Sequence, residues 1–270
     1  MQVGIFAKTF AGKDPATVMA ASAAAGYQGV AYNMTCSGLE AMPDQITQAQ
    51  IAAITDAARS TGQAIMSLSG TYNMIHPDPV VRAKGHARLA VLAAAARSIG
   101  TSLITLCTGT RDAADQWRHH PDNTTPQAWD DLIQSFKIAV QISEKYDIYL
   151  GVEPELANVV NGADAARRLI EQMQSDRIRI VLDPANLFET TPDPKPILHH
   201  AIQLLAPHIA MAHAKDRTPT GGFATAGTGV VDFPDFLTTL RNAGFNGPLV
   251  THGLTATEAP QVATFLRGLS

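Results

Sequence analysis

Short apolar runs of β type alternate with longer Ala- and Leu-rich amphipathic runs from one end of this 270-residue chain to the other. Alternation of this kind is typical of parallel βα units and argues against an all-α or an all-β fold. Eight such pairs can be counted, and eight βα units close into a (β/α)8 barrel of about 250 residues. The sequence therefore predicts an α/β protein with a single (β/α)8 TIM barrel domain over residues 1–270.

The ends of the expected elements carry local signals. Asp14-Pro15 places an N-cap before a proline at the first helical position, and glycines follow several amphipathic runs. Strands are expected at Val3–Ala7, Gly29–Tyr32, Ala64–Ser69, Leu103–Cys107, Ile148–Glu153, Ile178–Asp183, Ile209–His213 and Pro248–His252. Helices are expected over about 14–25, 47–61, 79–98, 126–145, 162–174, 195–205, 232–242 and 256–268.

Four side chains that commonly bind metals end the last four expected strands, namely Glu153, Asp183, His213 and His252. The C-terminal ends of barrel strands converge on one mouth, so these residues can share one divalent cation. The mixed nitrogen and oxygen set suits Zn²⁺, Mn²⁺, Co²⁺ or Fe²⁺ better than Mg²⁺ or Ca²⁺. The alternative is that the carboxylates cap helices or pair with arginines and that the histidines are core residues.

Four short segments from the second half of the chain carry a family resemblance. They are Val152-Glu-Pro-Glu155, Val181-Leu-Asp-Pro-Ala-Asn-Leu187, Ala212-His-Ala-Lys-Asp216 and Phe245-Asn-Gly-Pro-Leu-Val250. With the eight-unit layout, they make the whole chain resemble the xylose isomerase-like barrel superfamily of sugar isomerases and epimerases, which also includes the endonuclease IV group. The resemblance implies that Glu153, Asp183 and His213 bind the metal.

Two positions depart from the pattern of that superfamily. Where related sequences end the eighth strand with a glutamate, this chain has His252, and in ketose 3-epimerases that glutamate is one of two acid–base residues. Histidine is a neutral ligand with a reference pKa of about 6.5 instead of 4.3, so a two-glutamate epimerisation does not carry over directly. Asn186 stands where an Asp-x-x-His pattern often supplies a histidine, which argues against a three-metal nuclease site.

Other polar residues near the expected mouth are candidates for catalysis and substrate binding. Glu153 is the candidate base, and Lys215 is a second catalytic candidate because its ammonium can hydrogen-bond a substrate oxygen. Substrate contacts are predicted for Lys8, Tyr72, His76, Asn186 and Arg217. The alternatives are that Lys8 and Lys215 are solvated or salt-bridged and that Arg217 is a surface residue that binds no phosphate or carboxylate. For His76 the alternative is that it caps a helix or packs beside Pro77.

Three long segments follow expected strands and are expected to build the active-site face, namely residues 70–79, 108–125 and 215–231. The last contains paired glycines typical of a mobile flap. In the second, Trp117 with His119 and His120 is interpreted either as a lid over a sugar ring or as surface packing. Cys107 is interpreted as a small apolar filler and not as a nucleophile.

The charge and composition of the chain bear on which partners it can bind. The net charge is −4 and no Lys/Arg stripe could follow a phosphate backbone, which disfavours nucleic-acid binding. Two cysteines fit a reducing cytoplasm, and the longest apolar stretch is too short for a membrane span. The first residues lack a basic segment followed by a long apolar one, so no signal peptide is expected. We therefore expect a cytoplasmic protein with a small sugar or polyol as substrate and no nucleic-acid or membrane partner; a homo-oligomer is compatible with the sequence.

The leading hypothesis is a metal-dependent isomerase or epimerase that moves a proton on a small ketose or polyol-like hydroxy-ketone through an enediolate. The alternative is a metal-dependent dehydratase, a lyase, that expels a β-hydroxyl from a sugar-like or cyclic polyol. A non-catalytic sugar-binding barrel and an abasic-site endonuclease are less favoured.

Overall fold

Eight parallel strands close into a barrel in the computed structural model, which describes residues 1–269. Going round the barrel, each strand pairs with the next in chain order, and the last pairs with the first. The strands are β1 (Val3–Phe6), β2 (Gly29–Tyr32), β3 (Ala64–Ser69), β4 (Leu103–Cys107), β5 (Tyr149–Glu153), β6 (Ile178–Leu182), β7 (Ile209–Ala214) and β10 (Leu249–Thr251). The predicted (β/α)8 barrel is confirmed.

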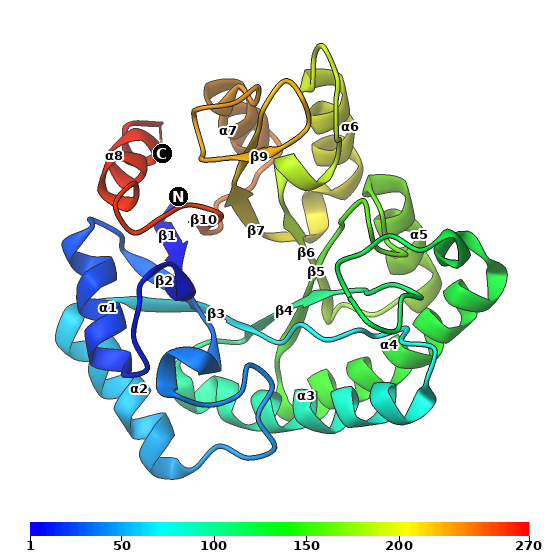
Figure 1. Cartoon of the computed structure of the whole chain (residues 1–270), viewed down its shortest axis with the longest axis horizontal. Helices are drawn as coiled ribbons and strands as arrows, with labels where there is room; N and C mark the ends of the chain where they lie inside the picture. The colour runs from blue at the N-terminus through cyan, green and yellow to red at the C-terminus, as the bar shows by residue number, and fades with distance from the viewer. Residues whose placement is uncertain (270) are drawn as a thin grey trace.

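Helices follow the strands and form a ring outside the barrel (Figure 1). They are α1 (Pro15–Ala24), α2 (Gln48–Thr61), α3 (Pro79–Ile99), α4 (Pro126–Tyr146), α5 (Ala163–Met173), α6 (Lys195–Leu205), α7 (Phe233–Asn242) and α8 (Ala259–Leu269). Local signals fix many of their ends: Asp14 accepts a hydrogen bond from the Thr17 amide, and Thr47 forms a capping box with Gln50. No helix within residues 1–269 is long and apolar enough to cross a membrane.

The interior of the barrel is packed with side chains. One cluster of buried residues comes from six strands: Ala31, Met66, Leu103, Val181, Met211 and Val250. Gly4 leaves room for Met66, because a Cβ at this position would overlap the Met66 sulfur. A filled interior leaves a ligand only the ends of the barrel, and in this fold the C-terminal end carries the site.

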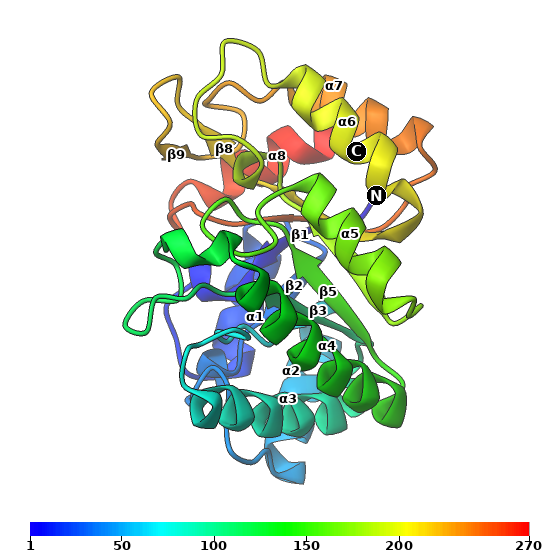
Figure 2. The same ribbon diagram turned by 90° about the vertical axis from the view of Figure 1, so that its right-hand side faces the viewer.

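The segment after β7, where the sequence suggested a flap, contains regular secondary structure. It folds into a small antiparallel hairpin, β8 (Asp216–Arg217) with β9 (Phe223–Ala224), which projects beyond the barrel at the left of the side view in Figure 2. Asp216 is buried and accepts hydrogen bonds from the backbone amides of Gly227, Gly229 and Val231 at 2.9–3.1 Å. This carboxylate fixes the returning part of the loop.

Candidate metal centre and active-site cavity

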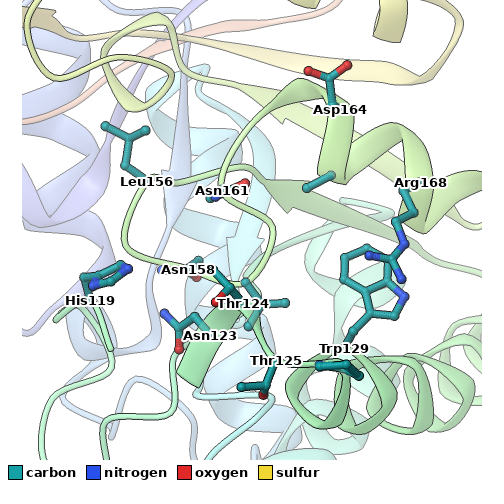
Figure 3. Close-up of a pocket in the computed structure, with 13 residues that line it drawn as sticks. His119, Asn123, Thr124, Thr125, Trp129, Leu156, Asn158, Asn161, Asp164 and Arg168 are labelled. Carbon is teal, nitrogen blue, oxygen red and sulfur yellow. The ribbon is translucent and has the colours of Figure 1, made fainter. Parts of the chain in front are cut away.

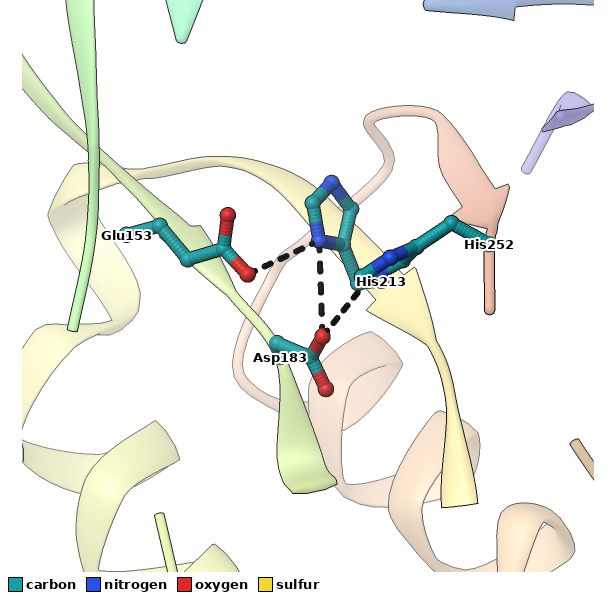
Figure 4. A group of neighbouring side chains, drawn as sticks. All are labelled: Glu153, Asp183, His213 and His252. Atoms are coloured by element: carbon teal, nitrogen blue, oxygen red, sulfur yellow. Dashed lines mark hydrogen bonds and ion pairs between the residues drawn. The ribbon is translucent and has the colours of Figure 1, made fainter. Parts of the chain in front are cut away.

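Glu153, Asp183, His213 and His252 meet at the C-terminal mouth of the barrel (Figure 4). Glu153 ends β5, Asp183 and His252 each follow one residue after their strands, and His213 lies within β7. One ligand atom from each residue lies within 4.8 Å of those from the others. Four side chains that are far apart in the sequence therefore surround one point.

His213 lies between the two carboxylates of this cluster (Figure 4). Its Nδ1 is 3.3 Å from Glu153 Oε1 and 3.6 Å from Asp183 Oδ2. Asp183 Oδ2 is also 2.8 Å from His252 Nε2. The other Asp183 oxygen accepts a hydrogen bond from the Ala185 amide at 2.9 Å, which fixes the orientation of the carboxylate.

Two of the predicted site residues support the cluster from one side. Asn186 donates from Nδ2 to Glu153 Oε1 at 2.7 Å and accepts from Lys215 Nζ at 2.7 Å. Lys215 also lies 3.3 Å from Asp183 Oδ2. All three contacts are buried or nearly so, and they link both carboxylates of the cluster through one amide and one ammonium.

Burial and the neighbouring charges shift the pKa values of His213, Asp183 and His252. Burial lowers the pKa of His213, but the charge of Glu153 and the contacts with both carboxylates outweigh burial and raise the pKa to about 9. Burial raises the pKa of Asp183, yet Lys215 and the two histidines hold it well below its usual range. Burial lowers the pKa of His252. In the absence of a cation, a proton on His213 therefore offsets the carboxylates.

The residues present fit a divalent metal ion. Two carboxylates and two imidazoles converge from four strands, and the cluster attracts positive charge strongly enough to hold a proton on His213. A metal ion would take the place of that proton, because imidazole must be deprotonated at the ligating nitrogen. The donor set favours Zn²⁺, Mn²⁺, Co²⁺ or Fe²⁺, and it does not distinguish among them.

The cluster lies in the wall of a cavity of about 310 Å³. Since a water molecule occupies about 30 Å³, the cavity has room for roughly ten waters or a small sugar. The lining residues are Phe6, Lys8, Ala31, Asn33, Ala41, Ser69, Thr71, Thr105, Cys107, Gln116, Trp117, Glu153, Glu155, Asn186, His213, Lys215, Val250 and His252. The wall is rich in polar groups, as expected for a hydroxylated ligand.

The predicted substrate-binding residues divide into two groups. Lys8 and Asn186 line this cavity, whereas Tyr72, His76 and Arg217 do not. Tyr72 and His76 line a neighbouring groove. The guanidinium of Arg217 is turned toward the backbone, where it donates to the carbonyl oxygens of Ala185 and Gly221. Direct contact with a substrate in this cavity is therefore not favoured for Tyr72, His76 or Arg217.

Glu155 and Asn33 line the cavity without having been singled out from the sequence. Burial, followed by the charge of Glu153, raises the pKa of Glu155 to about 7, and its Oε2 is buried without a hydrogen-bond partner. The signal for Glu155 was present: it lies two residues after Glu153, and residues at that spacing in an extended chain face the same side. Asn33 carried no comparable signal.

A larger cavity, of about 440 Å³, lies outside the mouth and is shown in Figure 3. It is bordered by His119, the start of α4 and the segment between β5 and α5. The Arg168 guanidinium stacks on the Trp129 ring at 3.9 Å, so this cation is already engaged. Glu153, Asp183, His213 and His252, the candidate metal-binding cluster, lie at the smaller cavity, so volume does not identify the site here.

Solved structures of similar fold cover nearly the whole chain at low sequence identity. A 3-keto-D-glucoside 4-epimerase from E. coli matches with a TM-score of 0.80 and 16% identity, covering 99% of both chains. A D-psicose 3-epimerase from Clostridium cellulolyticum H10 matches with 0.76 and 16%, covering 100% of this chain and 99% of its own. A probable 3-DHS dehydratase from Bacillus anthracis matches with 0.78 and 12%, covering 99% of both chains. These likenesses establish the fold.

A comparison with curated protein sequences finds no significant match. The family model described as xylose isomerase-like TIM barrel matches residues 19–268, from α1 to α8. The match spans nearly the whole barrel, and it includes all four residues of the metal-binding cluster. The chain therefore belongs to the xylose isomerase-like TIM barrel family.

Proposed function

We propose that this protein is a metal-dependent isomerase or epimerase acting on a small ketose or polyol-like hydroxy-ketone. The observation that carries the proposal is the convergence of Glu153, Asp183, His213 and His252 on one point in the wall of a polar cavity. A divalent cation bound there would polarise a substrate carbonyl and hydroxyl and stabilise an enediolate. The fold neighbours that act on sugars support the choice of substrate class.

In this proposal Glu153 takes the proton from the carbon next to the carbonyl. Its carboxylate lies at the cavity wall, and the Asn186 amide holds Oε1 at 2.7 Å, which leaves Oε2 as the oxygen for the proton. Lys215 lines the same wall and offers its ammonium to a substrate oxygen. Lys8 and Asn186 complete the polar contacts to the substrate.

Dehydration is the second candidate reaction. His252 supplies a nitrogen ligand where an epimerase of the two-glutamate type has a second acid–base carboxylate, so Glu153 would be the only carboxylate of the cluster free to work on the substrate carbon. A single base suffices for removal of a proton followed by loss of a β-hydroxyl. One fold neighbour described as a probable 3-DHS dehydratase is consistent with this chemistry.

Proton exchange in D₂O tests the proposal and separates the two reactions. The Mn²⁺-loaded protein is incubated with D-fructose, D-psicose and D-tagatose, and the sugars are analysed by mass spectrometry. Isomerisation or epimerisation gives a product that gains deuterium and keeps its oxygens, whereas dehydration gives a product that has lost water. Absence of both reactions with Mn²⁺, Zn²⁺, Co²⁺ and Fe²⁺ would reject a catalytic role toward these sugars and favour a sugar-binding barrel.

Elemental analysis of matched variants tests the ligands. Glu153→Gln combined with His252→Ala is expected to lose bound metal, because both substitutions remove donor atoms. The control combines Glu171→Gln with His200→Ala, which changes the same residue types on the exposed faces of α5 and α6. Full metal occupancy in the first variant would refute the ligand assignment.

A further inference from the structure

The cavity has two chemically different halves that face each other across the barrel. Its buried acceptors, Glu153 and Glu155, belong to β5 and the segment directly after it. Lys8 and Asn33 follow β1 and β2, which lie on the opposite side of the closed ring of strands. No carboxylate lines the cavity on the β1–β2 side.

Lys8 and Asn33 line the cavity from the ends of two neighbouring strands, β1 and β2. Phe6 of β1 is paired with Ala31 of β2, and both residues line the cavity. Lys8 lies in the short 3-10 helix Ala7–Thr9 directly after β1, Asn33 directly follows β2, and both residues line the cavity. The segments after β1 and β2 contact each other, so we treat Lys8 and Asn33 as one patch, which we call the β1–β2 rim.

Two hydrogen-bond donors of the β1–β2 rim, the ammonium of the exposed Lys8 and the NH₂ of Asn33, have no protein partner within residues 1–269. Asn33 is only 4% exposed, and its Oδ1 accepts from the Thr35 amide and hydroxyl at 3.0 and 2.8 Å, which fixes the orientation of the side-chain amide. Its Nδ2 donates to no group within residues 1–269, and Asn33 lines the cavity. Among the same residues, the Lys8 ammonium pairs with no carboxylate. Lys215, in contrast, contacts Asp183 and Asn186.

The two unpaired donors of the β1–β2 rim favour a ligand group that accepts hydrogen bonds. A lysine ammonium and an amide NH₂ can only donate, and a sugar hydroxyl both donates and accepts, so a hydroxyl would leave its own proton unpaired at such a patch. The oxygens of a carboxylate or phosphate only accept, and their hydrogen bonds to a cation are charge-assisted. An anionic oxygen group therefore matches the β1–β2 rim better than a neutral polyol does.

We infer that the substrate carries an anionic oxygen group, a carboxylate or a phosphate, at the end that lies away from the metal-binding cluster. Lys8 and Asn33 bind this group. This inference rests on the proposed function in taking a sugar-like molecule as the occupant of the cavity. It narrows the substrate class from neutral ketoses to keto-sugar acids or keto-sugar phosphates. The reacting end then faces Glu153, and the anionic end faces the β1–β2 rim.

Three ligands that differ at one end test the inference. D-Fructose, D-fructuronate and D-fructose 6-phosphate are titrated into the Mn²⁺-loaded protein by calorimetry. At least one anionic ligand is expected to bind roughly 10–100-fold more tightly than D-fructose, since hydrogen bonds to charged groups contribute about 1.5–3 kcal/mol. The tighter of the two anions distinguishes carboxylate from phosphate. Equal affinities for all three ligands would overturn the inference.

Single substitutions test whether Lys8 and Asn33 cause the preference for the anionic ligands. Lys8→Met removes the charge and keeps the aliphatic stem, and Asn33→Asp keeps the acceptor for Thr35 while replacing the NH₂ donor with an anionic oxygen. Both are expected to abolish the preference for the anionic ligands, and the control Lys13→Met, outside the cavity lining, is expected to retain it. A preference that survives both substitutions would refute the assignment.

The same titrations with EDTA in place of Mn²⁺ separate this inference from the proposed function. If Mn²⁺ does not bind, or no sugar exchanges deuterium, but the Lys8-dependent preference persists, the metal-dependent reaction fails and the anion subsite stands. If exchange occurs with neutral ketoses and no anion preference exists, the subsite fails alone.

Discussion

Asn186 connects the two charged sides of the metal-binding cluster through a single amide. Its NH₂ donates to Glu153, and its carbonyl oxygen accepts from Lys215. Groups that hydrogen-bond metal ligands in this way orient them and limit the number of conformations that the free site can adopt. The sequence identified Asn186 as a departure from a histidine pattern, and its two partners became visible only in the folded chain.

We predict that Asn186→Leu weakens metal binding roughly 10–100-fold, because both hydrogen bonds are lost and Glu153 is no longer oriented. The measurement is a Mn²⁺ titration of the EDTA-treated protein by calorimetry. Asn242→Leu, at an exposed position at the end of α7, is the control for the same change of residue type. Unchanged affinity in Asn186→Leu would show that the amide does not support the ligands.

His86 gives a prediction about pH and stability. It is buried in α3, its Nε2 has no hydrogen-bond partner, and its ring meets Tyr72 edge-on at 5.7 Å. Burial, and next the nearby charge of Arg82, lower the pKa of His86 below its usual value of 6.5. The neutral form is therefore the one that the fold accepts.

A lowered pKa in the folded state means that the unfolded chain binds the proton more tightly. The stability contributed by neutral His86 is thus fully present above pH 6.5 and is lost as the pH falls through its folded pKa. We expect the free energy of unfolding of the wild type to fall more steeply than that of His86→Gln between about pH 7.5 and about pH 5. Urea unfolding across this range measures the difference; parallel curves would contradict it.

At the scale of elements, the segment after β7 is ordered by one buried carboxylate and by close backbone packing. Asp216 accepts hydrogen bonds from three amides of the loop after β9, and Gly229 approaches so closely that a Cβ there would overlap the Arg217 carbonyl oxygen and the Asp216 carboxylate. Glycines in this segment suggested a mobile flap from the sequence. In the structure, close packing requires one of these glycines, Gly229, since a side chain has no room there.

We predict that Gly229→Ala destabilises the protein by about 1–3 kcal/mol, the usual cost of overpacking. The matched control is Gly222→Ala in the turn between β8 and β9, where the nearest atom to a new Cβ would be the Thr218 hydroxyl at 3.4 Å, an ordinary contact. Urea unfolding and limited proteolysis of the hairpin compare the two variants. Equal stabilities would mean that the loop adjusts without cost.

Helix ends were predictable from the sequence at this scale because their signals are local. Asp14, Thr47 and Asp78 cap helices through contacts with residues only a few positions away. The β8–β9 hairpin was not predicted, since each of its strands has only two residues and the contacts of Asp216 and Phe223 within this segment become visible only in the fold; the Phe223 ring lies 4.0 Å from Lys215 Nζ. Such short strands leave no periodic pattern.

At the scale of the whole molecule, metal binding is expected to stabilise the folded barrel. The four ligands come from four strands, so the unfolded chain has no comparable site. At a free metal concentration of 100 Kd the gain is about 2.7 kcal/mol. For a chain of this size that corresponds to a rise in Tm of roughly 5–10 °C.

Scanning calorimetry of the EDTA-treated protein, with and without added Mn²⁺, measures this rise. Asp183→Asn with His213→Ala is expected to remove it, whereas Asp235→Asn with His199→Ala, a contacting pair that joins α6 to α7, is expected to keep it. A Tm that rises equally in both variants would place the stabilising metal elsewhere.

The sequence by itself determined the barrel and the four residues of the candidate metal centre. Hydrophobic periodicity and helix caps act over a few residues, and the closure of eight βα units follows from them. The convergence of strand ends in such a barrel then brings Glu153, Asp183, His213 and His252 together, which the structure bears out.

Only the tertiary structure decided which other side chains reach the cavity. Arg217 turns toward backbone carbonyls, Tyr72 packs against His86, and Asn33 and Glu155 line the mouth. The physical reason is that the direction of a side chain in a loop depends on partners distant in sequence. Those partners are set by packing across the barrel and not by the residues beside it in the chain.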